Sequence, residues 1–453
     1  MKAPQRIAVL SLACRFPDAK TPEELWRNVL DGHRSFRMLP TERLCLDAYR
    51  PERVGEALSI TPILAGLITD WEFDRTRFRV PKRSFEAADL VHWLALETAS
   101  NALASIAPDM LPRERTAVIL GNTLTGEFSR AAQVHLRLPY LQSKLTDALA
   151  QAGADKHLTD TAVSALHQAV ATDFSLPTEE TLAGGLANTI AGRIANHLDL
   201  HGGAWTVDGA CAASLLAIVD ACTRLQDGTL EAALVGGVDL SLDPFELVGF
   251  SRNGALARDQ MRVFDRRASG FWPGEGCGMA LLAPEHSALA KHHEPLAYLA
   301  GWGVSTDGAG GLTRPTVSGQ ALALRRAYAR ARIDPQEVGY VEAHGTGTAV
   351  GDPTEVEALA EVLGSRERRL PIGSIKANIG HTKAAAGIAG LIKTVMGIHQ
   401  GIVPPHVSCE EPHPVFAQTA GRVHPTRTAS PWATHGDAGR VGGVSGFGFG
   451  GVN

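Results

Sequence analysis

The sequence predicts a layered α/β protein, and two patterns indicate this class. Short β-rich runs end in Gly or Asp, and Ala/Leu-rich stretches with helical periodicity follow them. Strands bounded by helices of about 12 to 20 residues favour a layered α/β architecture over an all-β sandwich. The 453 residues fit two to four units, or one large two-lobed fold.

The predicted elements alternate along the chain. We expect strands at residues 7–12, 116–120, 204–207, 232–238, 339–343 and 371–375. We expect helices at residues 22–30, 85–106, 212–225, 321–332, 353–363 and 384–400. Residues 136–174 are a helical insertion that the pattern places only loosely.

A strand, a sharp loop and a helix follow one another around residues 207–225, and the same order returns after residue 339. This recurrence predicts two similar lobes, residues 1–258 and residues 259–453. The boundary fits because a Gly-rich stretch at 270–278 opens the second region.

Composition excludes several classes of protein. Hydrophobic residues make up 44%, charged residues 20%, and 43 Lys+Arg against 48 Asp+Glu give a net charge of -5, which is ordinary for a globular protein. Neither disorder nor a polybasic nucleic-acid binder is expected. The six cysteines form no C-x-x-C pair, which indicates a reducing, cytoplasmic setting.

No membrane partner is expected either. No apolar stretch reaches the length of about 18 residues that a membrane span needs. The N-terminal apolar run, residues 7–14, is interpreted as a buried strand rather than a signal peptide. Residues 15–17, Arg-Phe-Pro, interrupt it, and no small-x-small cleavage pattern follows.

A candidate nucleophile, Cys211, stands between a β-branched strand and a helix of small and apolar residues. The first turn of a helix offers unpaired N–H groups and a partial positive charge, which favour thiolate over thiol and can hold an oxyanion. The alternative is a buried, inert cysteine, which is the interpretation of Cys222 further along the same helix.

Two histidines follow strands in the second half of the chain. His344 begins a Gly- and Thr-rich loop, and His381 directly precedes another helix. Each alone is more often structural. Together with Cys211 at the end of a strand, they make a coherent set of a nucleophile and two acid/base groups.

These motifs resemble those of the β-ketoacyl synthases, the condensing domains of polyketide and fatty acid synthases. The resemblance rests on the cysteine elbow, on His-Gly-Thr-Gly-Thr at 344–348 with its Gly-Asp-Pro-x-Glu continuation, on Lys-x-Asn-x-Gly-His at 376–381, and on the Gly/Phe-rich segment at 446–451. It implies a thiolase-like αβαβα fold, a homodimer and a Cys-His-His site.

The resemblance also implies a mechanism, decarboxylative Claisen condensation. Cys211 would take the growing acyl chain from an acyl carrier protein, and a malonyl thioester would lose CO₂ to give an enolate. The Nε2–H groups of His344 and His381 would hold the enolate oxygen. The backbone N–H groups of Cys211 and Phe449 would hold the acyl oxyanion.

Four further residues receive supporting roles. Because a buried lysine without a partner is costly, Lys376 is expected to pair with Glu355, either as a structural ion pair or with an electrostatic role. The resemblance places the hydroxyls of Thr346 and Thr348 against a phosphopantetheine arm. Phe449 is expected to gate the acyl pocket, the alternative being simple core packing.

No cofactor or metal is expected on the chain itself, because the substrate travels on the phosphopantetheine of the carrier protein. The expected partners are that carrier protein, a second copy of the chain, and other domains of the same synthase. His406, Cys409 and His413 lie close together, but they have no fourth ligand and no ordered spacing. The pattern G-x-G-x-x-G at 446–451 lacks the following helix of a dinucleotide site.

Departures from the usual polyketide motifs favour a subtype. Residues 208–214, 88–97 and 271–277 resemble the iterative synthases of the enediyne and polyunsaturated fatty acid type more than modular ones. Iterative polyketide elongation, of a polyene or enediyne, is therefore predicted. The family continues past residues 451–453 into a last strand, so the chain is expected to be a piece of a longer polypeptide, with an unpaired edge at its end.

Two alternative functions differ in chemistry. A non-catalytic protein that sets chain length would lack the active cysteine, and Cys211 is present with both histidines. A thiolase condenses without decarboxylation and uses a second cysteine as base, and the motif at 376–382 with His381 argues against it.

Overall fold

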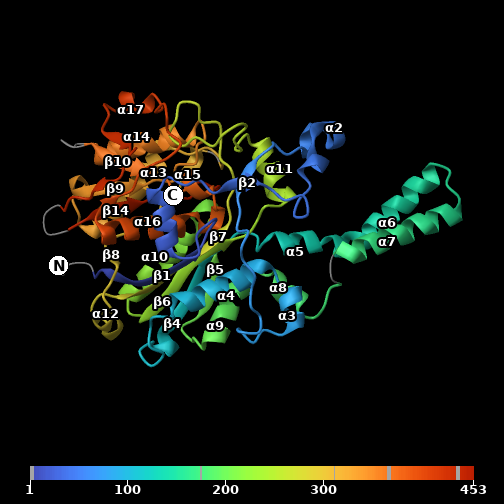
Figure 1. The fold of residues 1–453 in the computed structure, drawn as a ribbon, viewed down its shortest axis with the longest axis horizontal. Helices are drawn as coiled ribbons and strands as arrows, with labels where there is room; N and C mark the ends of the chain where they lie inside the picture. The colour runs from blue at the N-terminus through green and yellow to red at the C-terminus, as the bar shows by residue number, and fades with distance from the viewer. Residues whose placement is uncertain (1–4, 174–175, 311, 365–368, 435–438) are drawn as a thin grey trace.

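The computed structural model describes residues 5–173, 176–310, 312–364, 369–434 and 439–453, which form two stacked β-sheets with helices around and between them (Figure 1). The first sheet has six strands in the order β5-β4-β6-β7-β1-β8, and the second has four in the order β12-β10-β9-β14. Two small sheets, β11-β13 and β2-β3, complete the described strands. The predicted α/β class is confirmed.

The strands of the two main sheets are β1 (Ile7–Arg15), β4 (Thr116–Gly121), β5 (Ala204–Val207), β6 (Ala232–Asp239), β7 (Gly276–Pro284), β8 (Ala297–Leu299), β9 (Val338–Glu342), β10 (Leu370–Gly373), β12 (Val423–Pro425) and β14 (Val441–Val444). The small sheets contain β2 (Phe36–Met38), β3 (Leu64–Gly66), β11 (Ile402–Val403) and β13 (Ser430–Pro431).

The longer helices are α1 (Pro22–Leu30), α4 (Leu90–Ala102), α6 (Val134–Gln151), α7 (Lys156–Asp173), α9 (Asn188–Leu198), α10 (Ala213–Gln226), α11 (Pro244–Arg252), α13 (Val317–Ala331), α14 (Gly351–Leu363) and α16 (Ala386–Gln400). The shorter helices are α2 (Pro51–Val54), α3 (Lys82–Ala87), α5 (Glu127–Ala132), α8 (Thr181–Gly185), α12 (Ala288–His292), α15 (Lys376–Ile379) and α17 (Val415–Gln418).

The layers follow from the alternation of side chains along the strands. In β6, Leu234 and Val238 face one hydrophobic core, which also contains residues of α4 and α9, while Val235 faces another. That second core contains residues of α1, α10 and α16 and lies between the two sheets. Residues of α14 pack with the second sheet. This is the predicted five-layer αβαβα arrangement.

Most predicted elements are found, with two informative differences. The helix predicted at residues 85–106 is two helices, because the side chain of Asp89 caps α4 by accepting the N–H of Val91. Strand β7 was not predicted, since its glycines resemble a loop. Gly278 serves a close approach instead: a Cβ there would lie 3.0 Å from the side chains of Ile388 and Ile392 in α16.

Strand β7 also bears on the lobe boundary. It pairs antiparallel with both β6 and β1, so it belongs to the first sheet. Strand β8 belongs to this sheet too, so the first sheet takes strands from both sides of the boundary predicted between residues 258 and 259, and the division into two lobes stays a prediction.

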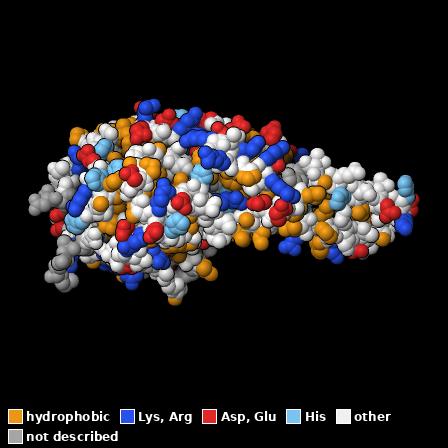
Figure 2. All heavy atoms as spheres, turned by 90° about the horizontal axis from the view of Figure 1, so that it is seen from below, with side chains coloured by type: hydrophobic (Ala, Val, Ile, Leu, Met, Phe, Trp, Pro, Cys, Tyr) orange, Lys and Arg blue, Asp and Glu red, His pale blue; other side chains and the backbone are white. Residues whose placement is uncertain are grey.

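The insertion predicted at residues 136–174 contains the helices α6 and α7, which pack against each other; Phe174 lies outside the described residues. The pair projects from the body of the molecule in Figures 1 and 2. Leu136, Tyr140 and Leu158 are each more than half exposed on it. None of the described helices is long and apolar enough to cross a membrane.

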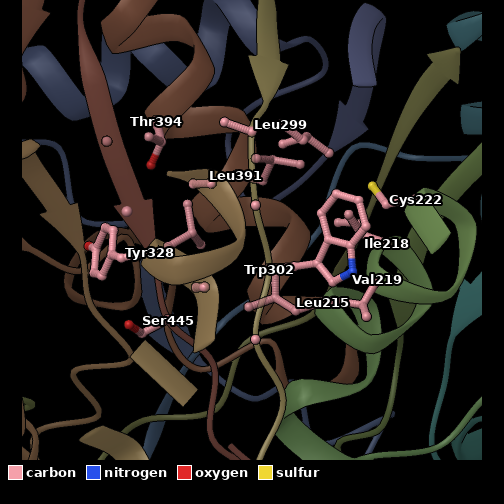
Figure 3. A pocket seen from close by; sticks show the side chains of 18 of the residues that line it. Leu215, Ile218, Val219, Cys222, Leu299, Trp302, Tyr328, Leu391, Thr394 and Ser445 are labelled. Atoms are coloured by element: carbon pink, nitrogen blue, oxygen red, sulfur yellow. The ribbon is translucent and has the colours of Figure 1, made fainter. Parts of the chain in front are cut away.

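The second sheet leaves a cavity beside β14. In the first sheet, β6 pairs with β4 on one side and with β7 on the other. In the second sheet, β14 pairs with β9 on one side, and among the described residues no strand pairs with its other side. A cavity of about 970 Å³ lies between β14 and residues 295–304, lined by side chains of α10, α13 and α16 (Figure 3). Asn453 lines it too, and exchanges two backbone hydrogen bonds of 3.0 Å with Ser305.

Candidate active site

Cys211 lies in a tight turn, Ala210–Ala212, between β5 and α10. Ala210 has φ +49°, a left-handed conformation that strains a residue with a Cβ. The side chain of Asp208 braces the turn, because its Oδ1 accepts the Ala210 N–H at 2.9 Å and the Thr123 hydroxyl at 2.9 Å. The thiol is thus held, 8% exposed, directly before a helix N-terminus.

The backbone of His344 is fixed from two sides. Its N–H donates to Glu355 Oε1 at 2.7 Å, and its carbonyl accepts from Lys376 Nζ at 2.6 Å. Glu355 Oε2 also accepts the N–H of Gly345 at 2.8 Å. The ion pair predicted between Lys376 and Glu355 is not among the salt bridges of the described chain, because each group binds the histidine backbone instead.

Backbone N–H groups determine the tautomers of both histidine rings. Phe447 N donates to His344 Nδ1 at 3.3 Å, and Lys383 N donates to His381 Nδ1 at 3.2 Å. An N–H can only donate, so each Nδ1 is an acceptor, and each neutral ring carries its proton on Nε2. The ring centroids lie 5.5 Å apart with the planes at 84°. Two Nε2–H donors are therefore available in one place.

Two contacts bring the cysteine turn to this pair. The Cys211 turn packs against the turn Lys383–Ala385, which begins two residues after His381. The segment around Phe447 packs against the Cys211 turn as well, since a Cβ on Gly448 would lie 2.2 Å from the carbonyl oxygen of Gly209. The structure thus gathers the three predicted site residues.

Burial dominates the titration of the site. It lowers the pKa of His344 and His381 well below the usual value, with further lowering by the Lys376 cation, so both rings are neutral near pH 7. It raises the pKa of Cys211 to about 12, although Lys376 acts in the opposite direction. This is opposite to the lowered pKa predicted from the helix N-terminus: burial outweighs the nearby positive charge.

The remaining predicted residues surround this centre. The hydroxyl oxygens of Thr346 and Thr348 lie 3.1 Å apart on the loop after His344. Phe449 is 41% exposed, and its ring lies 6.2 Å from that of Phe250 on α11. Among the described residues, no backbone carbonyl accepts the N–H of Cys211 or Phe449 in a loop or turn hydrogen bond.

Sequence reasoning missed several buried charges around the site. Asp352 accepts the N–H groups of Phe264 at 2.6 Å and Gly347 at 2.9 Å, and burial raises its pKa to about 6. Lys383 forms ion pairs with Asp239 and Glu246. The available signals were Asp352 inside the Gly-Asp-Pro motif and Lys383 two residues after His381.

The cavity beside β14 is separate from this centre. It shares Ala212 and Phe447 with the site's surroundings, but its lining contains Cys222 rather than Cys211, and neither histidine. Figure 3 shows Cys222, Ile218 and Trp302 around it. No group of three or more His, Cys, Asp or Glu residues in the described ranges could hold a metal ion.

Fold and site together define a class of protein, a thiolase-like α/β protein that gathers one cysteine and two histidines. Residues 4–288 match the family model for the N-terminal domain of β-ketoacyl synthases, and residues 296–410 match the model for the C-terminal domain. The chain therefore belongs to the β-ketoacyl synthase family, and it is a ketosynthase domain of the polyketide synthase kind. Such domains are acyl-transferring condensing enzymes that use acyl groups carried on the phosphopantetheine of an acyl carrier protein.

The curated relatives are large polyketide synthases. The chain is 36% identical to a phenolphthiocerol/phthiocerol polyketide synthase of Mycobacterium tuberculosis, with 99% of this chain and 22% of that protein covered. It is 35% identical to the polyketide synthase GfsB of Streptomyces halstedii, with 99% of this chain and 8% of that protein covered. The chain thus spans about a fifth or less of the length of these two relatives.

Solved structures of ketosynthases have the same fold as this chain. The oxazolomycin ketosynthase domain of Streptomyces albus matches with a TM-score of 0.83 and 26% identity, over 99% of this chain and 74% of that chain. The ketosynthase from module 6 of the bacillaene synthase of Bacillus subtilis matches with a TM-score of 0.79 and 28% identity, over 99% and 71%. The predicted thiolase-like fold is confirmed.

Proposed function

We propose that the chain catalyses decarboxylative Claisen condensation between an acyl group on Cys211 and malonyl-acyl carrier protein. The observation that carries this is the pair of histidines whose Nδ1 atoms accept backbone N–H groups, which leaves two Nε2–H donors close together. A developing enolate oxygen needs donors of this kind. Neither ring needs to act as a strong base.

The first half-reaction is acyl transfer. The sulfur of Cys211 attacks the carbonyl carbon of the carrier-bound thioester, its proton passes to the departing pantetheine sulfur, and the acyl group stays on Cys211. The backbone N–H groups of Cys211 and Phe449 are suited to hold the oxyanion of the tetrahedral intermediate. Burial raises the pKa of the Cys211 thiol to about 12, so the sulfur carries its proton near pH 7 before acyl transfer.

The second half-reaction joins the chains. The malonyl thioester loses CO₂, and the electron pair of the broken bond becomes an enolate held by the Nε2–H groups of His344 and His381. The enolate carbon then attacks the acyl carbonyl, and the Cys211 sulfur leaves and regains a proton. Lys376 and Glu355 keep His344 in place through its backbone, while Thr346 and Thr348 bind the phosphopantetheine arm and Phe449 gates the acyl pocket.

A decarboxylation assay tests this function. Malonyl-acyl carrier protein should release CO₂ with the chain alone, and release should be coupled to a β-ketoacyl product when Cys211 is acylated. A non-catalytic protein that only sets chain length would release none. A thiolase would join acetyl groups and leave malonyl intact, so either result would contradict the proposal.

We also propose the finer subtype, iterative elongation of a polyene or enediyne chain within a larger synthase. The departures at residues 208–214, 88–97 and 271–277 support it. The relatives named above are polyketide synthases that the comparisons do not assign to this subtype. Repeated extension by one active site in the whole synthase would support it, and a single extension followed by transfer would contradict it.

A homodimer is proposed through β5. This strand lies at one edge of the first sheet and leads directly to Cys211, so pairing with a second copy would continue the sheet across a two-fold axis. Sedimentation should give about 96 kDa, twice 48.0 kDa. A stable monomer would contradict the dimer but not the chemistry.

A further inference from the structure

Lys383 lies in a buried charged cluster that the proposed chemistry does not use. Its ammonium nitrogen is 2.9 Å from Asp239 Oδ1 and 3.4 Å from Glu246 Oε2, and it donates to the carbonyl oxygen of Ser241 at 2.7 Å. The lysine side chain is 5% exposed. These partners come from the end of β6, from the loop after it, and from α11, so one ammonium group joins three segments.

The backbone of the same residue contacts the active site. Lys383 N donates to His381 Nδ1 at 3.2 Å, with φ at +46°, in the left-handed region that favours glycine. The next residue, Ala384, donates its N–H to Asp239 Oδ2 at 3.3 Å. Asp239 therefore holds both the side chain of Lys383 and the backbone of its turn.

This arrangement explains why a lysine occupies a strained position. A left-handed residue with a Cβ persists only when its surroundings fix it. The carboxylates of Asp239 and Glu246 do so through the ammonium group. Without them the turn could relax, and its N–H would no longer point at the imidazole.

We propose that Lys383 is a positioning residue for decarboxylation: its ammonium group, held by Asp239 and Glu246, fixes the turn whose N–H keeps His381 with its proton on Nε2. This rests on the proposed role of His381 as an enolate donor. The cluster extends to α5, where Arg130 forms an ion pair with Asp243 and lies 4.0 Å from Glu246.

The charged and titratable groups around His381 predict the direction of a pH effect. Burial lowers the pKa of His381, and the cations of Lys376 and Lys383 and the ring of His344 lower it further. Loss of Lys383 removes one cation and frees Nδ1 from its donor. Both changes raise the pKa of His381, so the ring becomes protonated at a higher pH.

The test compares Lys383→Gln and Lys383→Gly with Ile392→Val, a conservative change in the apolar core on α16. CO₂ release from malonyl-acyl carrier protein is measured against pH and substrate concentration, and Cys211 acylation is followed by intact mass. For Lys383→Gln we expect kcat for decarboxylation to fall on the order of tenfold, less than the loss of an oxyanion donor itself. KM and Cys211 acylation should change little, and the acid limb of the pH profile should move to higher pH.

Lys383→Gly is the matched rescue variant, because glycine tolerates the left-handed backbone without an anchor, so it should keep more of the wild-type kcat than Lys383→Gln. Equal losses of kcat in the two variants would show that the anchored turn is not the cause, and would overturn the inference. If Lys383→Gln keeps the wild-type kcat and pH profile while its melting temperature falls, the lysine is only structural and the inference is overturned. Should the Lys383 variants not fold, Glu246→Gln keeps the shape and removes one charge. A folded Glu246→Gln protein with unchanged kcat and pH profile would equally overturn it.

The result separates this inference from the proposed function. If His381→Ala still releases CO₂ at the wild-type rate, His381 does not hold the enolate, and the proposed function itself is contradicted. Lys383 then has no enolate donor to position. If His381→Ala is inactive and the Lys383 and Glu246 variants behave like Ile392→Val, only the anchor is wrong.

Discussion

The two lobes deliver their functional groups by different means. In the first lobe, a six-stranded sheet ends at β5, and a strained turn places Cys211 directly before α10. In the second, His344 and His381 depend on buried charged residues: Glu355 of α14 and Lys376 of α15 bind the backbone of His344, and Lys383 donates its N–H to His381. Sheet pairing therefore positions Cys211, the proposed nucleophile, whereas buried charged residues position the two histidines.

This difference predicts how each lobe tolerates change. Mutation of the nucleophile should remove one step completely, because no other group replaces the sulfur. Mutation of Glu355, Lys376 or Lys383 should lower the rate of malonyl decarboxylation only partly, since the remaining charged residues still hold the histidines.

The largest effect is expected at the nucleophile. Cys211→Ala should abolish acyl loading, because the sulfur forms the bond to the acyl group. Cys222→Ala on the same helix should load nearly as well as the wild type, since Cys222 lies in the apolar core and lines the separate cavity. Intact-mass analysis after incubation with an acyl thioester measures both, and unchanged loading of Cys211→Ala would remove the mechanism.

The histidine substitutions should come next. His344→Ala and His381→Ala should each lower malonyl decarboxylation on the order of 10² or more, as loss of an oxyanion donor does. Acylation of Cys211 should remain measurable in both. Full condensation activity in either variant would contradict the proposed enolate-binding role of that histidine. It would also contradict the proposed difference between the two lobes.

A smaller effect is expected from the support of His344. Glu355→Gln should lower decarboxylation roughly five- to a hundredfold, because an unsatisfied buried N–H costs about 1–3 kcal/mol and the amide accepts through only one oxygen. Glu361→Gln is the matched control on α14, where Glu361 is exposed and pairs with Arg325. Equal activities of the two variants would show that His344 needs no buried carboxylate.

How much of the candidate site the sequence could predict depends on how far apart in the sequence the contacting residues lie. Cys211 and His344 follow the strands β5 and β9, and His381 follows the short helix α15 after β10, so local pattern was enough to select the three as candidates. The contacts of Lys376 and Lys383 could not be predicted in this way. Lys383 meets Asp239 across 144 positions of chain, and which oxygen a buried lysine reaches depends on packing that motifs do not record.

The ionisation of Cys211 illustrates the same limit. The sequence places the thiol at a helix N-terminus, which predicts a lowered pKa, but the degree of burial depends on tertiary packing, and burial raises the pKa to about 12. The local pattern selected Cys211 as a candidate, but it predicted a lowered pKa where burial raises the pKa.

That raised pKa gives a pH test. Since the thiol stays protonated well above pH 7, the rate of Cys211 alkylation by iodoacetamide should rise about tenfold for each pH unit from 7 to 9. The reaction is followed by peptide mass analysis, with Cys211→Ala protein as the background. A rate that is already constant near pH 7 would indicate a preformed thiolate and would restore the prediction from the helix N-terminus.

The smallest effect concerns the sheet of the second lobe. Val452 and Asn453 already lie antiparallel to Ser305 and Thr306, at the mouth of the cavity beside β14. We consider a segment of six residues, with apolar side chains at alternate positions, fused after Asn453. This segment should enter the cavity along residues 297–304 and pair with β14. The added pairing should raise the melting temperature by about a few degrees. A fusion with proline at alternate positions is the control, because proline cannot donate to a strand ladder. Equal melting temperatures for the two fusions would show that the cavity does not accept a strand, and that the second sheet is complete with the four strands it has.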